Sequence, residues 1–332
     1  MSPIVEIRDL HVRFHGERTV YALNGVDITL EQGEVLGLLG ESGSGKSVTL
    51  RALLRMLPPR RSRIEGSIRL DGEDVLALDE ASLEQIRGGV ASMIFQEPML
   101  ALDPVYTIGD QIAETVVRHR GANWAEGRKR ALEMLEMVRI PSARRRLDAY
   151  PHEMSGGMRQ RAMIALALSC HPKVLLADEP TTALDATVQM QILLLLRELQ
   201  REFGMAVIFV THDIGVAVEI SDRIAVMYGG RIVESGTLRE VVALPAHPYT
   251  KGLLSSTVHG ARRGKRLEAI PGAPPRLDRP PQGCAFAPRC GIADAACRDG
   301  DIAPVTITPG HSGRCLKLHG NRRPPSPRLP VS

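Results

Sequence analysis

Short apolar runs alternate with amphipathic segments along most of the chain. Residues 26–30 alternate apolar and polar side chains, which predicts a half-buried β-strand. Residues 35–39 form a continuous apolar run that ends at a glycine, a pattern typical of a strand buried on both faces. The same pattern recurs in four later runs, at residues 90–95, 174–177, 207–210 and 224–228.

The segments between these runs show helical periodicity. One apolar stripe, with residues spaced three or four apart, is formed by Val188, Ile192, Leu195, Leu199 and Phe203. Residues 48–57 and 163–168 are also predicted to be helical. Strands that alternate with such helices predict an α/β domain with a mainly parallel sheet.

Two segments depart from this alternation. Residues 107–150 are rich in Arg, Glu, Met and Ala and contain no strand-like run, so we interpret them as two or three inserted helices. From residue 244 onward prolines interrupt any helix, and four of the five cysteines follow. The last dozen residues are expected to be a poorly ordered basic tail, which is either solvated or in contact with anionic lipid headgroups.

Composition narrows the classes of function. A hydrophobic content of 43% excludes a mainly disordered chain, and an aromatic content of 3% argues against a base-stacking surface. The net charge of +4 comes from the C-terminal end, because no acidic residue follows Asp301. We therefore expect no nucleic-acid partner. No apolar run approaches the roughly 18 residues that cross a bilayer, and no secretory signal is expected, so a membrane role would depend on partner proteins.

Residues 40–47, Gly-Glu-Ser-Gly-Ser-Gly-Lys-Ser, match the phosphate-binding pattern G-x-x-x-x-G-K-[ST] between a predicted strand and a predicted helix. Glycines let backbone N–H groups approach phosphate oxygens, and the helix N-terminus adds partial positive charge. Lys46 would neutralise the β- and γ-phosphates of ATP, and Ser47 would supply an oxygen to Mg²⁺. The candidate nucleotide-binding residues here are Gly40, Glu41, Ser42, Gly43, Ser44, Gly45, Lys46, Ser47 and Val48.

An apolar run that ends in Asp178 and Glu179 complements this loop. We expect Asp178 to hold Mg²⁺ and Glu179 to activate the attacking water as a general base. A strand that ends in acidic residues is weak evidence alone, because many such residues are simply solvated. Together with the phosphate loop it predicts a nucleoside triphosphatase.

A second candidate anion site lies at Ser155, Gly156 and Gly157, which open the apolar helix at residues 163–168. A plain helix N-cap is the alternative interpretation. With both segments, the sequence resembles the ATP-binding cassette proteins, whose signature reads Leu-Ser-Gly-Gly-Gln. This chain has Met154 and Met158 in place of the leucine and the glutamine.

Further positions match the family in order. The resemblance implies a Mg²⁺-sensing glutamine loop at Gln96, a D-loop at Ala183–Leu184–Asp185, a switch histidine at His212 and an adenine-stacking aromatic at Tyr21. Each also has a simpler interpretation: a strand cap for Gln96, a helix N-cap for Asp185, a surface loop for His212 and a core position for Tyr21. The implied fold is an α/β P-loop NTPase of the ABC cassette type with an inserted helical subdomain.

Residues after 244 narrow the resemblance to oligopeptide and dipeptide import ATPases. The matching blocks are Pro245–Leu254, Ile270–Pro275 and Gly283–Cys290. We expect a cassette at residues 1–243 with a helical subdomain at about 97–160, and a small irregular extension at 244–332. The implied partners are two membrane permeases, a second and non-identical cassette ATPase facing this one head to tail, and an exported solute-binding protein. The implied location is peripheral, on the cytoplasmic face of the inner membrane.

The four late cysteines, Cys284, Cys290, Cys297 and Cys315, are spaced C-x₅-C-x₆-C-x₁₇-C. This differs from the tight pairs of zinc modules and from common ferredoxin runs. Peptide importers resemble this pattern, which implies a 4Fe–4S cluster; zinc and free thiols remain alternatives. Cys170 is expected to be a buried small hydrophobic residue.

Two other classes compete with a peptide importer: cassette ATPases that act in DNA repair or on ribosomes, and cassettes that bind ATP without hydrolysis. The chain has no long coiled-coil insertion, which disfavours the first, and it retains Glu179 and His212, which disfavours the second.

Overall fold

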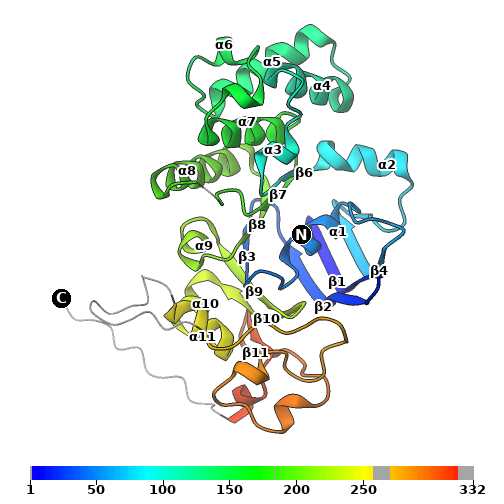
Figure 1. The fold of residues 1–332 in the computed structure, drawn as a ribbon, viewed down its shortest axis with the longest axis vertical. Coiled ribbons are helices and arrows are strands. Elements are labelled where there is room, and N and C mark those ends of the chain that lie inside the picture. Colours follow the sequence, from blue (N-terminus) through cyan, green and yellow to red (C-terminus); the bar gives the residue numbers. More distant parts are fainter. Residues whose placement is uncertain (1, 183, 257–269, 321–332) are drawn as a thin grey trace, which may run out of the picture.

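The computed structural model describes residues 2–182, 184–256 and 270–320, which form two sheets and the helices around them (Figure 1). The smaller sheet is antiparallel, with strand order β2-β1-β4-β5. Its strands are β1 (Val5–Phe14), β2 (Val20–Leu30), β4 (Ser62–Leu70) and β5 (Glu73–Asp74). Strand β1 pairs with both β2 and β4 along most of its length.

A bulge interrupts β1. Asp9 has a φ of 44°, and the register with β2 shifts between Ile7 and Leu10. Gly66 of β4 faces this bulge, and a Cβ there would lie 2.4 Å from the Asp9 carbonyl oxygen. The bulge reverses the alternation of buried and exposed side chains halfway along the strand. We did not predict this strand from the sequence.

The larger sheet carries the phosphate loop, and its strand order is β11-β12-β10-β9-β3-β8-β7-β6. Strands β9, β3, β8, β7 and β6 run parallel, which confirms the predicted parallel sheet. They are β3 (Val35–Leu39), β6 (Ala91–Ile94), β7 (Val174–Asp178), β8 (Ala206–Thr211) and β9 (Arg223–Tyr228). Strands β3, β6, β7 and β8 are buried throughout, as their continuous apolar runs indicate.

The helices lie around this sheet and in a separate layer above it (Figure 1). The upper layer holds α4 (Ile108–Arg120), α5 (Trp124–Met137) and α6 (Ala143–Arg146) over α7 (Gly156–Leu168). The predicted two or three inserted helices are therefore present. The other helices are α1 (Lys46–Leu53), α2 (Glu80–Gln85), α3 (Pro98–Ala101), α8 (Ala186–Phe203), α9 (Ile214–Ile220), α10 (Leu238–Ala243) and α11 (Pro248–Ser255).

Helix α1 ends earlier than predicted, at Leu53 rather than near Leu57. Arg55 has a φ of 49°, and two prolines follow at 58 and 59. Neither feature continues a right-handed helix.

The residues after α10 are joined to the large sheet. Strands β11 (Val305–Thr308) and β12 (His311–Gly313) pair with each other, and β12 pairs with β10 (Arg231–Thr237). Glu234 of β10 is buried and accepts hydrogen bonds from the backbone of Ala246 and His247 at 2.8 Å each and from His311 Nε2 at 2.9 Å. Short 3₁₀ turns at Ala287–Arg289, Ala296–Arg298 and Leu316–Gly320 make up much of the remaining extension.

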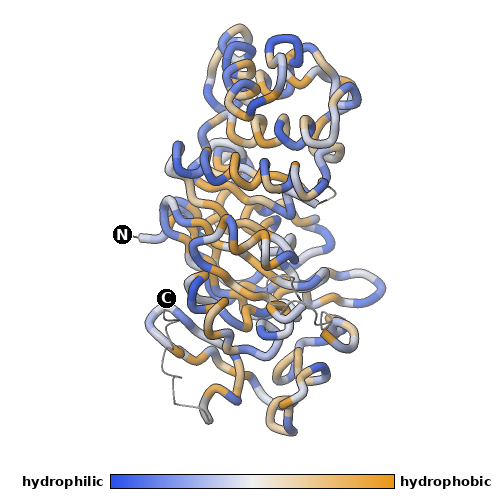
Figure 2. Tube along the Cα trace, turned by 90° about the vertical axis from the view of Figure 1, so that its left-hand side faces the viewer, coloured by the Kyte–Doolittle hydropathy of each residue, from blue (hydrophilic) through white to orange (hydrophobic). Residues whose placement is uncertain are grey.

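Hydrophobic positions concentrate along the central sheet and between it and the helices, while hydrophilic positions lie at the outer turns (Figure 2). Cys170 is 1% exposed, which confirms its predicted burial. In the described ranges 2–182, 184–256 and 270–320, no helix has the length and apolarity needed to cross a bilayer. The predicted tail at 321–332 lies outside the described residues, whereas Arg314 and Lys317 contact the Ile302 carbonyl and Asp294.

Candidate nucleotide site and four-cysteine pocket

The phosphate loop connects β3 to α1 and lines a cavity of about 880 Å³. Gly45, the N-cap of α1, has a φ of 111°, and a Cβ there would lie 2.7 Å from the side chain of Leu23. This position therefore requires glycine. Loop residues 41–48 line the cavity with Gln96, Glu179, Thr182 and His212.

Lys46 is folded back onto its own loop. Its Nζ donates to the carbonyl oxygens of Gly40 at 2.7 Å and Glu41 at 3.1 Å, and it lies 3.8 Å from Glu179. Burial lowers the pKa of Lys46, although the nearby carboxylates of Glu179, Asp178 and Glu41 act in the opposite direction. The lysine side chain is thus buried and desolvated beside the phosphate loop.

Ser47 and Asp178 form an oxygen pair at the base of the loop. Ser47 Oγ donates to Asp178 Oδ1 at 2.7 Å. Burial raises the pKa of the Asp178 carboxyl, against the effect of this hydrogen bond. Hydroxyl and carboxylate oxygens are the donor types that Mg²⁺ prefers, so this pair fits the ion that an ABC cassette uses with ATP.

Glu179 is the centre of the polar groups opposite the loop. Its Oε2 accepts from Gln96 at 3.4 Å, from Thr182 Oγ1 at 3.1 Å and lies 3.1 Å from His212 Nδ1. The residue adopts a left-handed conformation with a φ of 45°, and its backbone N–H donates to Val210. Such strain is typical of residues that a functional site holds in place.

The structure thus brings Lys46, Ser47, Asp178, Gln96, Glu179 and His212 together. It does not bring Ser155, Gly156 and Gly157 to this cavity. Ser155 caps α7 and accepts from the Met158 N–H at 3.3 Å, and both Ser155 and Gly156 are exposed. Met154 is buried in the core, so the departure from the family leucine retains an apolar side chain.

Asp185 caps α8 by accepting from Thr187 and Val188 at 3.1 and 3.0 Å. Ala183, the first residue of the predicted D-loop, lies outside the described residues.

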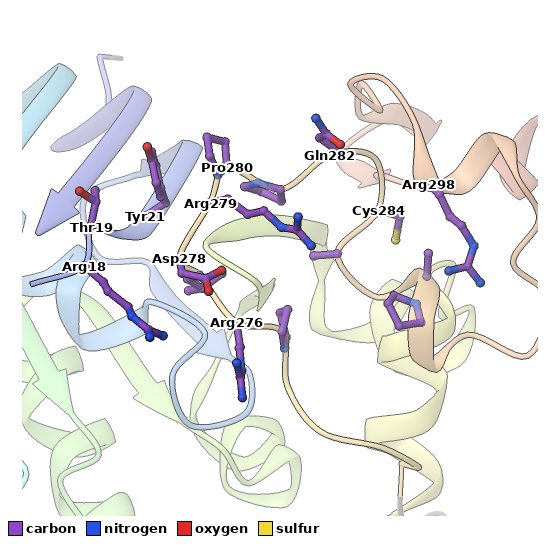
Figure 3. Close-up of a pocket in the computed structure, with 16 residues that line it drawn as sticks. Arg18, Thr19, Tyr21, Arg276, Asp278, Arg279, Pro280, Gln282, Cys284 and Arg298 are labelled. Carbon is purple, nitrogen blue, oxygen red and sulfur yellow. The ribbon is translucent and has the colours of Figure 1, made fainter.

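Tyr21 is not in the wall of the phosphate-loop cavity. Its backbone N–H donates to Leu277, and its side chain lines a second, open cavity of about 1080 Å³. Figure 3 shows Tyr21 beside the segment that carries Asp278 and Pro280, with Cys284 further along the same cavity. The aromatic residue that lines the phosphate-loop cavity is Phe14, at the end of β1. A prediction of β1 as a strand would have placed Phe14 at its end, beside the phosphate-loop cavity.

Sequence reasoning also missed the contribution of the extension to this cavity. Leu253, Ser256, Ile270 and Leu277 form part of its wall, although they lie more than 200 residues after the phosphate loop. No local pattern in the sequence indicates this contact.

The four late cysteines line one small pocket with His247. None of the four forms a disulfide in the described part of the chain, and Cys297 and Cys315 are buried. Burial raises the pKa values of Cys284 and Cys315. His247 is 1% exposed; its Nδ1 accepts from the Tyr249 N–H at 3.1 Å and its Nε2 lies 3.7 Å from Cys284 Sγ. Burial lowers the pKa of His247 to about 4, so the ring is neutral and its Nε2 carries the proton.

Within residues 2–182, 184–256 and 270–320, no group of three or more His, Cys, Asp or Glu side chains is arranged so that it could hold a metal ion. This includes the cysteine pocket.

Two family descriptions match the chain. Residues 23–182 match the ABC transporter family, and residues 233–297 match the family described as oligopeptide/dipeptide transporter, C-terminal region. The second match spans the start of the extension and three of its four cysteines.

Relatives match over nearly the whole length. A protein from Brucella melitensis biotype 1, named as a peptide import ATP-binding protein, is 50% identical over 329 residues, covering 95% of this chain and 97% of that protein. A protein from Sinorhizobium fredii, named as a peptide ABC transporter ATP-binding protein, is 49% identical and covers 95% of each chain.

Solved structures match the cassette. A dimeric ATP-binding cassette in a post-hydrolysis state with ADP and phosphate is 34% identical with a TM-score of 0.63, covering 71% of this chain and 99% of that one. A subunit of an ABC transporter complex from Clostridium perfringens is 29% identical with the same TM-score, covering 74% and 92%. ABC cassettes use ATP with Mg²⁺ and work with transmembrane permeases and a second cassette. This chain belongs to the ATP-binding cassette family, as an ATPase of the branch that carries the oligopeptide/dipeptide transporter C-terminal region.

Proposed function

We propose that this chain hydrolyses ATP to power the import of peptides through a membrane ABC transporter. The observation that carries the ATPase assignment is the position of Glu179, opposite Lys46 across one cavity and beside the Ser47–Asp178 pair. The C-terminal region and the names of the relatives support peptides as the substrate class. The proposed location is the cytoplasmic face of the inner membrane, through contact with permeases.

The residues of the cavity divide into three roles. Residues 40–48 bind the phosphates through backbone N–H groups and Lys46. Ser47, Asp178 and Gln96 would hold Mg²⁺, which would supply positive charge to the β- and γ-phosphates. Glu179 takes a proton from the attacking water, and Gln96, Thr182 and His212 orient its carboxylate.

We propose that the nucleotide site is completed by a second cassette. Ser155, Gly156 and Gly157 do not line the cavity of their own chain, and exposed Ser155 caps the N-terminus of α7. Together with Asp185 they would face the phosphate loop of the partner. The dimeric state of a similar cassette supports this arrangement. We further propose a non-identical second ATPase, two permeases and an exported solute-binding protein as partners.

The aromatic residue beside adenine is better assigned to Phe14 than to Tyr21. Phe14 and Val20 lie on the wall of the phosphate-loop cavity, whereas Tyr21 lines the neighbouring one. A ring in this position would contribute stacking energy to nucleotide binding.

We propose the predicted division of the chain as its domain organisation. It comprises a cassette at 1–243, with a helical subdomain at about 97–160, and an extension at 244–332. The hairpin β11–β12 joins the extension to the cassette sheet, so the two units fold against one another.

We propose that the four cysteines hold a 4Fe–4S cluster. They line one pocket, and in a cubane each of four thiolates binds a different iron. Their C-x₅-C-x₆-C-x₁₇-C spacing lacks the tight pairs of zinc modules, which favours the cluster over zinc. Protein purified without oxygen should contain about four irons per chain, and a zinc-loaded or metal-free protein would contradict this assignment.

The test of the proposed function is to purify the chain from its native membrane with a tag and to identify the proteins that accompany it. Permeases and a second cassette are expected. The complex in proteoliposomes should take up peptides with ATP and fail to do so with the Glu179→Gln variant. Co-purification of nucleic acid or ribosomes in place of permeases would overturn the proposal.

A further inference from the structure

The first residue after Gly40 in the phosphate loop is held by two residues of the C-terminal extension. Arg289 donates to both carboxylate oxygens of Glu41, at 2.6 and 3.0 Å. The hydroxyl of Tyr249 accepts from the backbone N–H of Glu41 at 2.8 Å. The extension therefore contacts both the side chain and the main chain of one loop residue.

The Arg289–Glu41 pair is largely removed from water. The Arg289 side chain is 5% exposed and that of Glu41 is 25% exposed. A paired, two-pronged contact between guanidinium and carboxylate fixes orientation as well as distance. Loss of the Glu41 carboxylate would leave the buried Arg289 guanidinium without its charged partner, so this contact differs from a solvated surface ion pair.

Further contacts fix the position of Arg289 itself. Its Nε donates to the Pro271 carbonyl at 2.7 Å and its Nη2 to the Ile270 carbonyl at 3.2 Å. Its Nη1 also contacts the Tyr228 hydroxyl at 3.1 Å. Tyr249 is fixed in a different way, by its ring packing 4.5 Å from that of Tyr228. Both residues are therefore anchored by contacts that lie outside the phosphate loop.

The contact continues from Glu41 to the phosphate-binding lysine. The carbonyl oxygens of Gly40 and Glu41 are the two backbone acceptors of Lys46 Nζ. Arg289 holds the side chain of Glu41, and Tyr249 holds its backbone N–H, which belongs to the same peptide group as the Gly40 carbonyl. A shift of Glu41 would therefore move the two carbonyl oxygens that accept from Lys46 and change the geometry of the phosphate loop.

Both anchoring residues lie next to the cysteine pocket. Arg289 immediately precedes Cys290 and ends the 3₁₀ turn Ala287–Arg289, which follows Cys284. Tyr249 lies two residues after His247, whose ring reaches Cys284. The same two short segments thus line the cysteine pocket and hold the phosphate loop.

We propose that Arg289 and Tyr249 are positioning residues of the phosphate loop, which act through Glu41 and make nucleotide affinity depend on the packing of the four-cysteine segment. This inference rests on the proposed function only in requiring that the loop binds nucleotide. It does not depend on which metal, if any, the cysteines hold.

The direct test is the dissociation constant of Mg-ADP for the full chain, measured by titration calorimetry. Arg289→Ala should weaken binding about tenfold, about 1.4 kcal/mol, because Glu41 loses both of its guanidinium hydrogen bonds. Tyr249→Phe keeps the packed ring and removes one neutral acceptor, so it should weaken binding about threefold. Arg289→Lys should recover part of the loss.

Arg231→Ala is the matched control. Arg231 also joins the cassette to the extension, through Asp301 at 2.6 Å, but it does not contact the phosphate loop. It should leave the dissociation constant within twofold of wild type. Wild-type affinity in Arg289→Ala and Tyr249→Phe would overturn the inference, whereas failure of the wild-type chain to bind Mg-ADP would instead overturn the proposed function.

A double-mutant cycle tests whether Arg289 acts through Glu41. If it does, Glu41→Ala with Arg289→Ala should bind Mg-ADP no more weakly than Glu41→Ala alone. Additive losses would contradict the proposed route. In the complex, Arg289→Ala should raise KM for ATP while kcat changes by less than twofold, because Glu179 and His212 keep their contacts. An equal loss in kcat would contradict the positioning role.

Thermodynamic linkage supplies a measurement on the extension itself. If the cysteine segment affects nucleotide affinity, nucleotide must affect the cysteine segment to the same extent. Saturating Mg-ADP should slow hydrogen exchange in peptides covering residues 284–297 of the wild-type chain. The slowing should be absent in Arg289→Ala, and its absence in the wild type would overturn the coupling.

Discussion

The phosphate loop and the cysteine extension both use short turns to gather ligand groups, yet they are held in place differently. The loop lies between a fully buried parallel strand and a helix, and its backbone is fixed by regular hydrogen bonding on both sides. The extension has little regular structure around its cysteines and is fixed by side chains such as Glu234 and Arg289. The comparison teaches that a regular scaffold fixes both ends of a site through its backbone, although Glu41 inside the loop is also held by Arg289 and Tyr249, whereas an irregular segment depends on individual polar contacts along its whole length.

Glu179→Gln should have the largest effect on the rate of ATP hydrolysis and should not change the packing of the extension. Loss of the general base should slow ATP hydrolysis by about 10²–10⁴-fold, because a positioned base contributes that much to the rate. Binding of Mg-ADP should remain within about threefold of wild type. The checks are steady-state phosphate release from the complex and calorimetric titration. Normal turnover in this variant would mean that another group activates the water.

Glu234→Ala should undock the extension while the parallel sheet stays folded. The substitution leaves two backbone N–H groups and His311 without their buried acceptor, which should cost about 3 kcal/mol in the free energy of unfolding. Urea denaturation measures the loss. Glu240→Ala is the control, because Glu240 also contacts the extension through Thr308 but is more exposed, and it should cost about 1 kcal/mol. Equal losses in the two variants would show that burial does not distinguish the contacts.

Phe14→Ala and Tyr21→Ala should show which of the two neighbouring cavities contributes an aromatic ring to nucleotide binding. Removing a stacked ring costs about 1–3 kcal/mol, so Phe14→Ala should weaken Mg-ADP binding about tenfold. Tyr21→Ala should change it by less than about twofold, since Tyr21 lines the other cavity. The same titration measures both variants. A larger effect at Tyr21 would reverse the assignment.

Substitutions of Asp185 should have the smallest effects on stability. The asparagine variant tests its carboxylate without removing the N-cap of α8. Asp185→Ala should lower the free energy of unfolding by about 1 kcal/mol, whereas Asp185→Asn should leave it nearly unchanged, because asparagine caps helices equally well. Denaturation of both variants checks this. If Asp185→Asn keeps its stability but loses ATP hydrolysis in the complex, the carboxylate has a role in the paired cassettes beyond capping α8.

Much of the cassette could be predicted because its signals are local. The runs at 35–39 and 174–177 are continuous and apolar, and buried parallel strands require this pattern. The phosphate loop follows one of them and Asp178 ends the other, so strand pairing through β8 brings Ser47 and Asp178 together. Strand β1 was missed because the bulge at Asp9 reverses its alternation, and Phe14 was missed with it.

The sequence by itself determined the parallel sheet, the phosphate loop, the acidic pair at the end of β7 and the grouping of four cysteines, because each is encoded by neighbouring residues. Only the tertiary structure decided that Phe14 rather than Tyr21 lines the phosphate-loop cavity, that Ile270 and Leu277 close it, and that Arg289 reaches Glu41. These contacts join residues up to 248 positions apart. Their formation depends on how the extension packs on β10. A local pattern of hydrophobic and polar residues does not predict that packing.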